Sequence, residues 1–193
     1  YEGGIRVPLI VYWPGHTEPG MVTDVPVTGT DFYPTLLEML DLPLMPEQHK
    51  DGISFVPLLE GKPFIGHDAI YWHFPHYSNH GNQSPGGAVR VGKYKLLEYF
   101  ENGTVQLFDL ENDLGEQSDI SKQNPEITQN LLKMLQDWRQ ETDAKMPQIK
   151  TPESVRRKFP VTAAFKKKFP GNPLHMRTSS CGKRGNPGFR EEY

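Results

Sequence analysis

Residues 88–110 read AVRVGKYKLLEYFENGTVQLFDL, three short apolar runs separated by turn residues. Gly92-Lys93 lies between the first two runs as a two-residue turn. Asn102-Gly103 precedes the third run and predicts a type I′ turn. A further strand is predicted at residues 68–74. The runs therefore predict an antiparallel sheet of about four strands.

A long helix is predicted after this sheet, at residues 125–142. Its apolar side chains fall on one stripe and are Ile127, Leu131, Leu132, Leu135 and Trp138. A small sheet with one helix across it buries such a stripe, which indicates an α+β subdomain. Between sheet and helix, residues 112–116 predict a turn in which Gly115 takes the unusual backbone angle.

The first part of the chain is predicted to combine a strand and short helices. The apolar residues 5–12 lie between Gly3-Gly4 and Pro14-Gly15, which predicts a buried strand. Residues 51–61 predict a short helical turn that Ser54 caps and Gly61 ends.

A core helix is predicted at residues 30–40, with Thr30 or Asp31 as its cap. Its apolar face would consist of Phe32, Leu36, Leu37 and Leu40. Asp31 could also be a catalytic carboxylate, but a capping or supporting role is the better interpretation.

Composition and charge restrict the classes of protein. Hydrophobic residues make up 36% of the 193, and no apolar run approaches the roughly 20 residues of a membrane helix. Residues 151–193 carry a formal charge of +7, which leaves −10 for residues 1–150. A basic, Pro-rich tail could bind a polyanion, but we prefer a tail that covers the acidic body. The single cysteine, Cys181, lies in this tail and is not expected to be a nucleophile.

The chemically richest stretch is residues 71–83, which read YWHFPHYSNHGNQ. It contains His73, His76 and His80 among aromatic and amide side chains. A zinc site is disfavoured because no Cys, Asp or Glu partner is nearby. Aromatic rings and hydrogen-bonding groups suit a sugar, and an imidazolium suits a sulfate or carboxylate. We predict that these three histidines bind substrate, with ordinary surface histidines as the alternative.

Several segments together resemble the arylsulfatase-like enzymes of the alkaline phosphatase superfamily. They are YEGGIRVP at residues 1–8, DFYPTLL at 31–37, DGISFVPLL at 51–59, GKYKL at 92–96 and the turn DLENDLGE at 109–116. The resemblance covers roughly residues 1–145. It implies an α/β fold: the end of an alkaline phosphatase-like sulfatase domain at residues 1–66, a small C-terminal α+β subdomain at 67–148, and the tail at 149–193.

The resemblance also implies a chemistry that these residues would not complete. Such enzymes hydrolyse sulfuric esters with a formylglycine nucleophile, made from a Cys-x-Pro-x-Arg segment, and one calcium ion. This chain holds neither that segment nor the calcium ligands, so we expect no catalytic or metal-binding residue in it. Its partners would be an N-terminal catalytic portion and a sulfated sugar or aryl sulfate, without nucleic acid or a membrane span. The compartment would be the periplasm or the exterior.

Two roles are left open beside that of a sulfatase. One is a non-catalytic carbohydrate-binding or assembly module. The other is a related phosphohydrolase or phosphonate hydrolase, which would use Thr or Ser with two metals. Within the sulfatase interpretation, we expect Glu2 and Arg6 to pair and to hold the Gly3-Gly4 turn under the sulfate site.

Overall fold

The computed structural model describes residues 1–77 and 84–148. Residues 1–147 form one compact unit, and the second unit begins at Gln148. The basic tail with Cys181 and the position of His80 therefore lie outside the described residues. Within the described ranges, no helix is both long and apolar enough to cross a membrane. The boundaries at residues 66/67 and 148/149 stay predictions.

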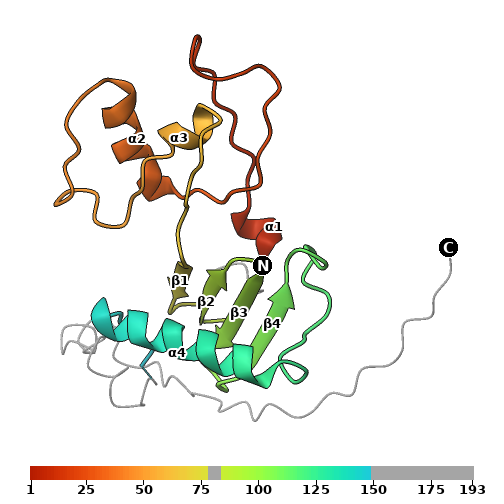
Figure 1. Cartoon of the computed structure of the whole chain (residues 1–193). Coiled ribbons are helices and arrows are strands. Elements are labelled where there is room, and N and C mark those ends of the chain that lie inside the picture. The colour runs from red at the N-terminus through yellow and green to blue at the C-terminus, as the bar shows by residue number, and fades with distance from the viewer. Residues whose placement is uncertain (78–83, 149–193) are drawn as a thin grey trace, which may run out of the picture. The chain divides into compact units, whose positions relative to one another are not determined.

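A four-stranded antiparallel sheet is the centre of the C-terminal part (Figure 1). Its strands are β1 (Ile70–Phe74), β2 (Gly86–Val91), β3 (Tyr94–Tyr99) and β4 (Val105–Asp109), paired in that order. Val91 pairs with Tyr94, so Gly92 and Lys93 form the predicted two-residue turn. The φ of Gly92 is +54°, a value that a two-residue hairpin turn requires. The predicted sheet is confirmed.

The turn between β3 and β4 differs from the prediction. A type I′ turn needs positive φ at both central residues, but only Gly103 has it, at +67°. The amide oxygen of Asn102 instead accepts hydrogen bonds from the backbone N–H and the hydroxyl of Thr104, at 3.0 and 2.6 Å. This side-chain bond stabilises a longer loop, so the type I′ prediction is wrong.

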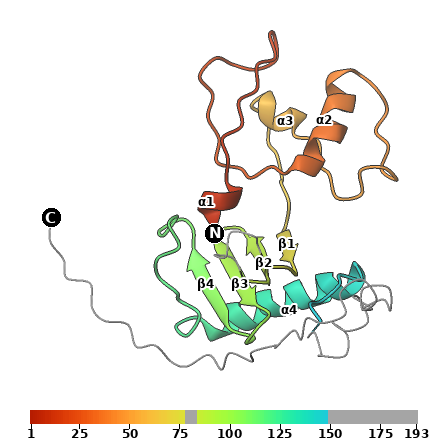
Figure 2. The ribbon, with the colours of Figure 1, turned by 180° about the vertical axis from the view of Figure 1, so that it is seen from behind.

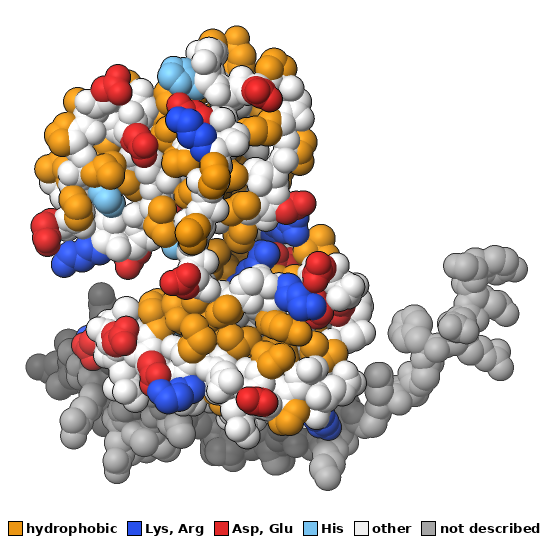
Figure 3. Space-filling model, viewed as in Figure 1, with side chains coloured by type: hydrophobic (Ala, Val, Ile, Leu, Met, Phe, Trp, Pro, Cys, Tyr) orange, Lys and Arg blue, Asp and Glu red, His pale blue; other side chains and the backbone are white. Residues whose placement is uncertain are grey.

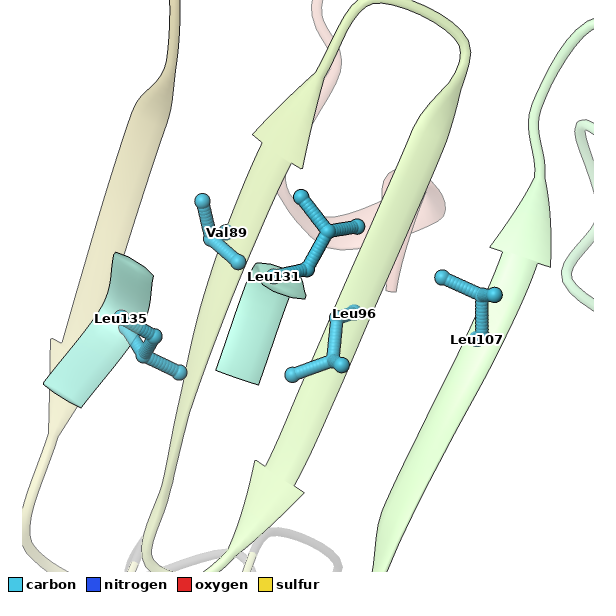
Figure 4. Close-up of a cluster of buried hydrophobic side chains, with 5 residues drawn as sticks. All are labelled: Val89, Leu96, Leu107, Leu131 and Leu135. Carbon is cyan, nitrogen blue, oxygen red and sulfur yellow. The ribbon is translucent and has the colours of Figure 1, made fainter. Parts of the chain in front are cut away.

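Helix α4 (Pro125–Glu141) covers one face of the sheet and confirms the predicted helix. It lies in front of the sheet in Figure 1 and behind it in Figure 2. Figure 4 shows the core between them, where one aliphatic side chain from each of β2, β3 and β4 meets two leucines of α4. These buried residues are Val89, Leu96, Leu107, Leu131 and Leu135.

The second face of the sheet carries a different set of side chains. Successive residues of a strand point to opposite faces, so Arg90, Lys95 and Phe108 lie on the face away from the aliphatic core. They are cross-strand partners, since Lys95 pairs with both Arg90 and Phe108. A sheet with one helix usually exposes such a face to water. Here Lys95 and Phe108 are buried.

The outer edge of β4 is occupied by the segment that precedes α4. The N–H of Leu107 donates to the carboxylate of Asp119 at 3.1 Å. The carbonyl of Leu107 accepts a hydrogen bond from the N–H of Ile120 at 2.9 Å. The outward backbone groups of Leu107 therefore find partners in a loop.

Residues 5–12 do not form the predicted strand. A single helical turn, α1 (Glu2–Ile5), is followed by chain without regular structure through Trp13. Val7, Ile10 and Tyr12 are 78%, 91% and 87% exposed. A strand needs neighbouring strands for its backbone hydrogen bonds. No strand within the described ranges pairs with residues 5–12.

Three short helices follow, and the buried face of the longest is not the predicted one. They are the 3₁₀ turn η1 (Gly29–Asp31), α2 (Phe32–Met39) and α3 (Val56–Leu59). The helix at residues 30–40 and the turn at 51–61 are thus confirmed. Ser54 is not the predicted cap, because the N-cap of α3 is Phe55 and it makes no side-chain cap hydrogen bond. The buried residues of α2 are Pro34 and Thr35, whereas Phe32, Leu36 and Leu40 are exposed. Figure 3 shows many hydrophobic side chains on the surface of this part of the chain.

Candidate functional site

The first residue of the chain is fixed on the second face of the sheet. The Tyr1 hydroxyl lies 2.7 Å from the Tyr99 hydroxyl and donates to Oε1 of Gln106 at 3.1 Å. Its ring meets the edge of Phe108, with centroids 6.1 Å apart. Burial and the hydrogen bond with Tyr1 raise the pKa of Tyr99, so this hydroxyl stays protonated.

Glu2 and Lys95 form the centre of a buried charge cluster. The Lys95 ammonium is fully buried and donates to Oε1 of Glu2 at 2.9 Å. Arg90 Nη1 lies 3.7 Å from the other oxygen of Glu2. Lys95 Nζ also lies 5.7 Å from the centroid of the Trp72 ring on β1. The carboxylate of Glu2 is therefore held by two cations of neighbouring strands.

Glu116 completes the cluster from the turn after β4. Its Oε1 lies 2.9 Å from Lys95 Nζ as an ion pair, and its Oε2 accepts the backbone N–H of Glu2. Glu116 has a φ of +53°, whereas Gly115 does not have a positive φ. The prediction that Gly115 takes the unusual angle is therefore wrong. A non-glycine residue in this conformation is strained, and its two buried contacts hold it there.

The Glu2–Arg6 pair expected from the sequence is not formed. Glu2 pairs with Lys95 and Arg90, and Arg6 lies 3.3 Å from the exposed carboxylate of Asp24. The backbone still links the two residues, because the Arg6 N–H donates to the Glu2 carbonyl at 2.8 Å. The role of both residues beside a sulfate site stays a prediction.

An open cleft of about 640 Å³ lies between this N-terminal turn and the turn that carries Glu116. Its walls are residues 1–3, Arg6 and residues 114–117. A Cβ added at Gly3 or Gly4 would meet no atom within 4 Å. The half-exposed guanidinium of Arg6 gives the cleft a cation that can bind an anionic group.

The predicted histidines lie in different surroundings. His73 is on β1, its Nε2 donates to the Lys145 carbonyl at 3.0 Å, and its ring is 5.4 Å from Phe100. His76 is exposed beyond the end of the strand, beside Phe74. Among the described residues, no three His, Cys, Asp or Glu side chains are grouped to hold a metal ion. The substrate-binding role of His73, His76 and His80 stays a prediction.

Asp31 lies at the junction of three segments. Its carboxylate accepts the N–H groups of Thr28 and Ile53 at 2.6 and 2.9 Å, and His67 Nε2 lies 2.8 Å away. Burial alone would raise the pKa of Asp31, but the hydrogen bonds from Ile53, Thr28 and His67 lower it below the usual value. Asp31 stands at the N-cap position of α2, but its side chain makes no cap hydrogen bond there and instead closes a capping box with Thr28 on η1, so the predicted cap of α2 is wrong and the supporting role holds. His67 is a partner that the sequence did not reveal.

The chain matches the family model described as N-sulphoglucosamine sulphohydrolase, C-terminal, over residues 1–142. The chain belongs to this sulfatase family. It is 37% identical to a sulfatase of Formosa agariphila over 135 residues, which are 65% of this chain and 24% of that protein. It is 31% identical to human arylsulfatase A over 171 residues, 75% of this chain and 32% of the enzyme. The chain thus spans about a quarter to a third of these relatives.

Solved structures share its fold, among them that of a sulfatase. The crystal structure of Ps i-CgsB in complex with k-i-k-neocarrahexaose matches with a TM-score of 0.57 and 25% identity, over 81% of this chain and 34% of that one. A 2-O GAG sulfatase matches with a TM-score of 0.51 and 26% identity, over 59% of this chain and 25% of its own. The predicted fold class, an α/β fold like that of the alkaline phosphatase-like sulfatases, is therefore confirmed.

Proposed function

We propose that the protein containing this chain is a sulfuric ester hydrolase that acts on a sulfated carbohydrate. The observation that carries the proposal is the family match over residues 1–142, which includes both the N-terminal turn and the sheet on which it lies. Sugar-directed relatives support the substrate class, since one similar structure is a 2-O GAG sulfatase and another holds a neocarrahexaose.

Within this enzyme, the described residues would bind and orient rather than react. The Arg6 guanidinium would bind an anionic oxygen of the substrate in the cleft, because it presents a fork of N–H donors to it. His73, His76 and His80 would contact sugar hydroxyls or acid groups farther from the sulfur. Formylglycine would supply the nucleophile and calcium would stabilise charge on the sulfate. The described residues contain no group of three His, Cys, Asp or Glu side chains, and we propose that the calcium ligands belong to other residues of the enzyme.

The activity is tested on the full-length enzyme. We expect hydrolysis of a small aryl sulfate and of sulfated oligosaccharides, and little turnover of the matching phosphate and phosphonate esters. A preference for the phosphorus esters would instead identify the related phosphohydrolase. Binding of the oligosaccharide without turnover of any ester would identify a carbohydrate-binding module.

The 193-residue chain by itself should not hydrolyse sulfate esters. Its only cysteine, Cys181, is not in a Cys-x-Pro-x-Arg segment, and the described residues hold no metal-binding group of three. The measurement is turnover of an aryl sulfate with and without added calcium, compared with a heat-treated sample. Turnover above that sample would contradict the proposal.

The histidines are tested by a contrast between two substrates. In the full-length enzyme, His76→Ala or His80→Ala should lower kcat/KM for the natural sulfated sugar about tenfold or more, as expected when a substrate loses a polar partner. Hydrolysis of a small aryl sulfate should hardly change, because that substrate would not reach these residues. His16→Ala, which removes a histidine that stacks on Trp13, is the matched control. Equal losses on both substrates would show that the histidines support folding or the catalytic centre.

The compartment is part of the same proposal. We infer a periplasmic or secreted protein from the family resemblance, and fractionation of cells that express the full-length gene tests it. Recovery of the protein with the cytoplasmic fraction would contradict it.

A further inference from the structure

We propose that Lys95 is a positioning residue for the sulfate site: buried between Glu2 and Glu116, it fixes the N-terminal turn and, through that turn, the guanidinium of Arg6. The catalytic half of this inference, that Lys95 positions Arg6 for substrate, rests on the proposed function. Its structural half, that Lys95 holds residues 1–6 in place, can be tested separately.

The contacts form a continuous path from Lys95 to the cleft. The Lys95 ammonium binds the Glu2 carboxylate at 2.9 Å. The Glu2 carbonyl accepts the Arg6 N–H at 2.8 Å. Arg6 lines the cleft, and its side chain has one exposed partner at 3.3 Å. The backbone position of Arg6, from which its side chain reaches the cleft, is therefore set by Glu2.

The glycines between these anchors make the position of the turn depend on Glu2. Gly3 and Gly4 have no side chain, and the space where a Cβ would point is open. Their backbone is thus not held by packing in that direction. The fixed points of the segment are the Tyr1 hydroxyl on the sheet, and the carboxylate and backbone N–H of Glu2.

Stability alone does not account for such a cluster. Two carboxylates and two cations lie on the face of a sheet whose other face is packed with aliphatic residues. Apolar side chains of similar volume often stabilise a buried site as well as ion pairs do. The backbone of Glu116 also has a positive φ, which is strained for a non-glycine residue, while its side chain contacts Lys95 and Glu2. Ion pairs and hydrogen bonds fix geometry more strictly than apolar contacts, which is what a positioning role requires.

The first experiment separates positioning from stability in the full-length enzyme. Lys95→Met is compared with Leu135→Ala, a core variant on the opposite face of the sheet, at temperatures where both are fully folded. Inhibition by inorganic sulfate reports directly on the anion site. We expect the inhibition constant to rise at least tenfold in Lys95→Met and to stay unchanged in Leu135→Ala. Equal values in the two variants would overturn the proposal.

A double-mutant cycle tests the path through Arg6. If Lys95 acts through Arg6, then Arg6→Met and Lys95→Met should each lower kcat/KM for a small aryl sulfate at least tenfold. The double variant should lose no more than the worse single variant. Losses that multiply would show that Lys95 acts independently of Arg6 and would overturn the path. If Lys95→Met does not fold, Glu116→Gln replaces it, because this change keeps the side chain's size and removes one charge of the cluster.

A last measurement distinguishes failure of this inference from failure of the proposed function. In the Lys95→Met variant of the full-length enzyme, trypsin should cut the Arg6–Val7 bond at least tenfold faster than in the parent protein, the full-length enzyme without substitutions. The reason is that the N-terminal turn is released. Leu135→Ala should show no such change at that bond. If the parent protein hydrolyses no sulfate ester but this contrast appears, the proposed function fails and the anchoring by Lys95 holds. If the parent enzyme is active and the contrast is absent, the inference on Lys95 fails.

Discussion

Asp31 shows how one buried carboxylate can organise segments that are distant in sequence. It accepts hydrogen bonds from Thr28 and Ile53 and contacts His67, so it joins three parts of the chain. A buried polar group is tolerated only when its hydrogen bonds are made. Asp31 therefore has a structural role that depends on its negative charge.

Asp31→Asn should destabilise the protein by about 1–3 kcal/mol, because the new NH₂ group would face donors instead of acceptors. The pKa of Asp31 is lowered in the folded state from the ordinary 3.8. Its stabilising effect is therefore fully present above pH 3.8 and is lost as the pH falls through the lower folded-state pKa. Melting temperatures of both proteins should differ at neutral pH and converge near the acid end. Asp24→Asn, at an exposed carboxylate, is the control and should have no effect at either pH.

Gly52 is required because another backbone approaches it closely. A Cβ at this position would lie 2.3 Å from the carbonyl oxygen of Thr30. We expect Gly52→Ala to cost about 1–3 kcal/mol through displacement of the η1 turn. Gly29→Ala in the same turn, where a Cβ meets no atom within 4 Å, is the matched control. Equal melting temperatures for the two variants would contradict this explanation.

The roles of Lys95 and Glu116 could not be predicted from their local sequence. A lysine in a strand of a sheet with one helix normally faces water, so its alternation pattern does not indicate burial. Its ion pair with Glu2 joins residues that are 93 positions apart in the chain. In the turn at residues 112–116, Gly115 was expected to take the unusual backbone angle. This expectation failed because Glu116 takes it instead, and the contacts that hold Glu116 are also long-range.

At the scale of elements, the sequence predicted those helices and strands that depend on contacts between residues close together in the chain. The β2–β3 hairpin and α4 were predicted because turn residues and a 3.6-residue stripe specify them over short distances. The buried face of α2 was predicted wrongly. Its apolar residues suggested a core, but its buried residues are Pro34 and Thr35. Thr35 is held by hydrogen bonds to Asp31 and Phe55, which hydrophobicity does not reveal.

Helix α4 should respond to substitution according to which side chains enter the core. Leu135 is fully buried between α4 and the sheet, whereas Leu132 is only partly buried. Leu135→Ala should destabilise the protein by about 2–5 kcal/mol, and Leu132→Ala by clearly less. Chemical unfolding followed by circular dichroism measures both. A larger effect at Leu132 would mean that α4 is rotated relative to the structure described here.

At the scale of the whole molecule, the surface near the N-terminus exposes more large apolar side chains than protein surfaces usually do. Val7, Ile10 and Tyr12 lie on one stretch that the sequence predicted to be a strand. Apolar surfaces of this kind usually mark an interaction site. The family match covers only the C-terminal region of sulfatases, so we infer that other parts of the enzyme cover this stretch.

Ile10→Asp tests that inference through a comparison of two proteins. In the isolated 193-residue chain, where Ile10 is 91% exposed, the melting temperature should stay the same. In the full-length enzyme the same change should bury a charge and lower the melting temperature by several degrees or prevent folding. Lys50→Asp, at an exposed residue of the same part of the chain, is the control for added negative charge. An unchanged full-length enzyme would show that the stretch faces water there as well.

The loop along β4 has a consequence for self-association. An unpaired edge strand is a template on which another chain can add a strand, and this is a common route to aggregation. Asp119 and Ile120 occupy the N–H and carbonyl groups of Leu107, so a foreign strand could not pair there without displacing them. Within the described residues the other edge of the sheet is β1, so we expect strand addition to begin there. An aggregation-resistant variant of this protein should therefore be sought by changes at β1.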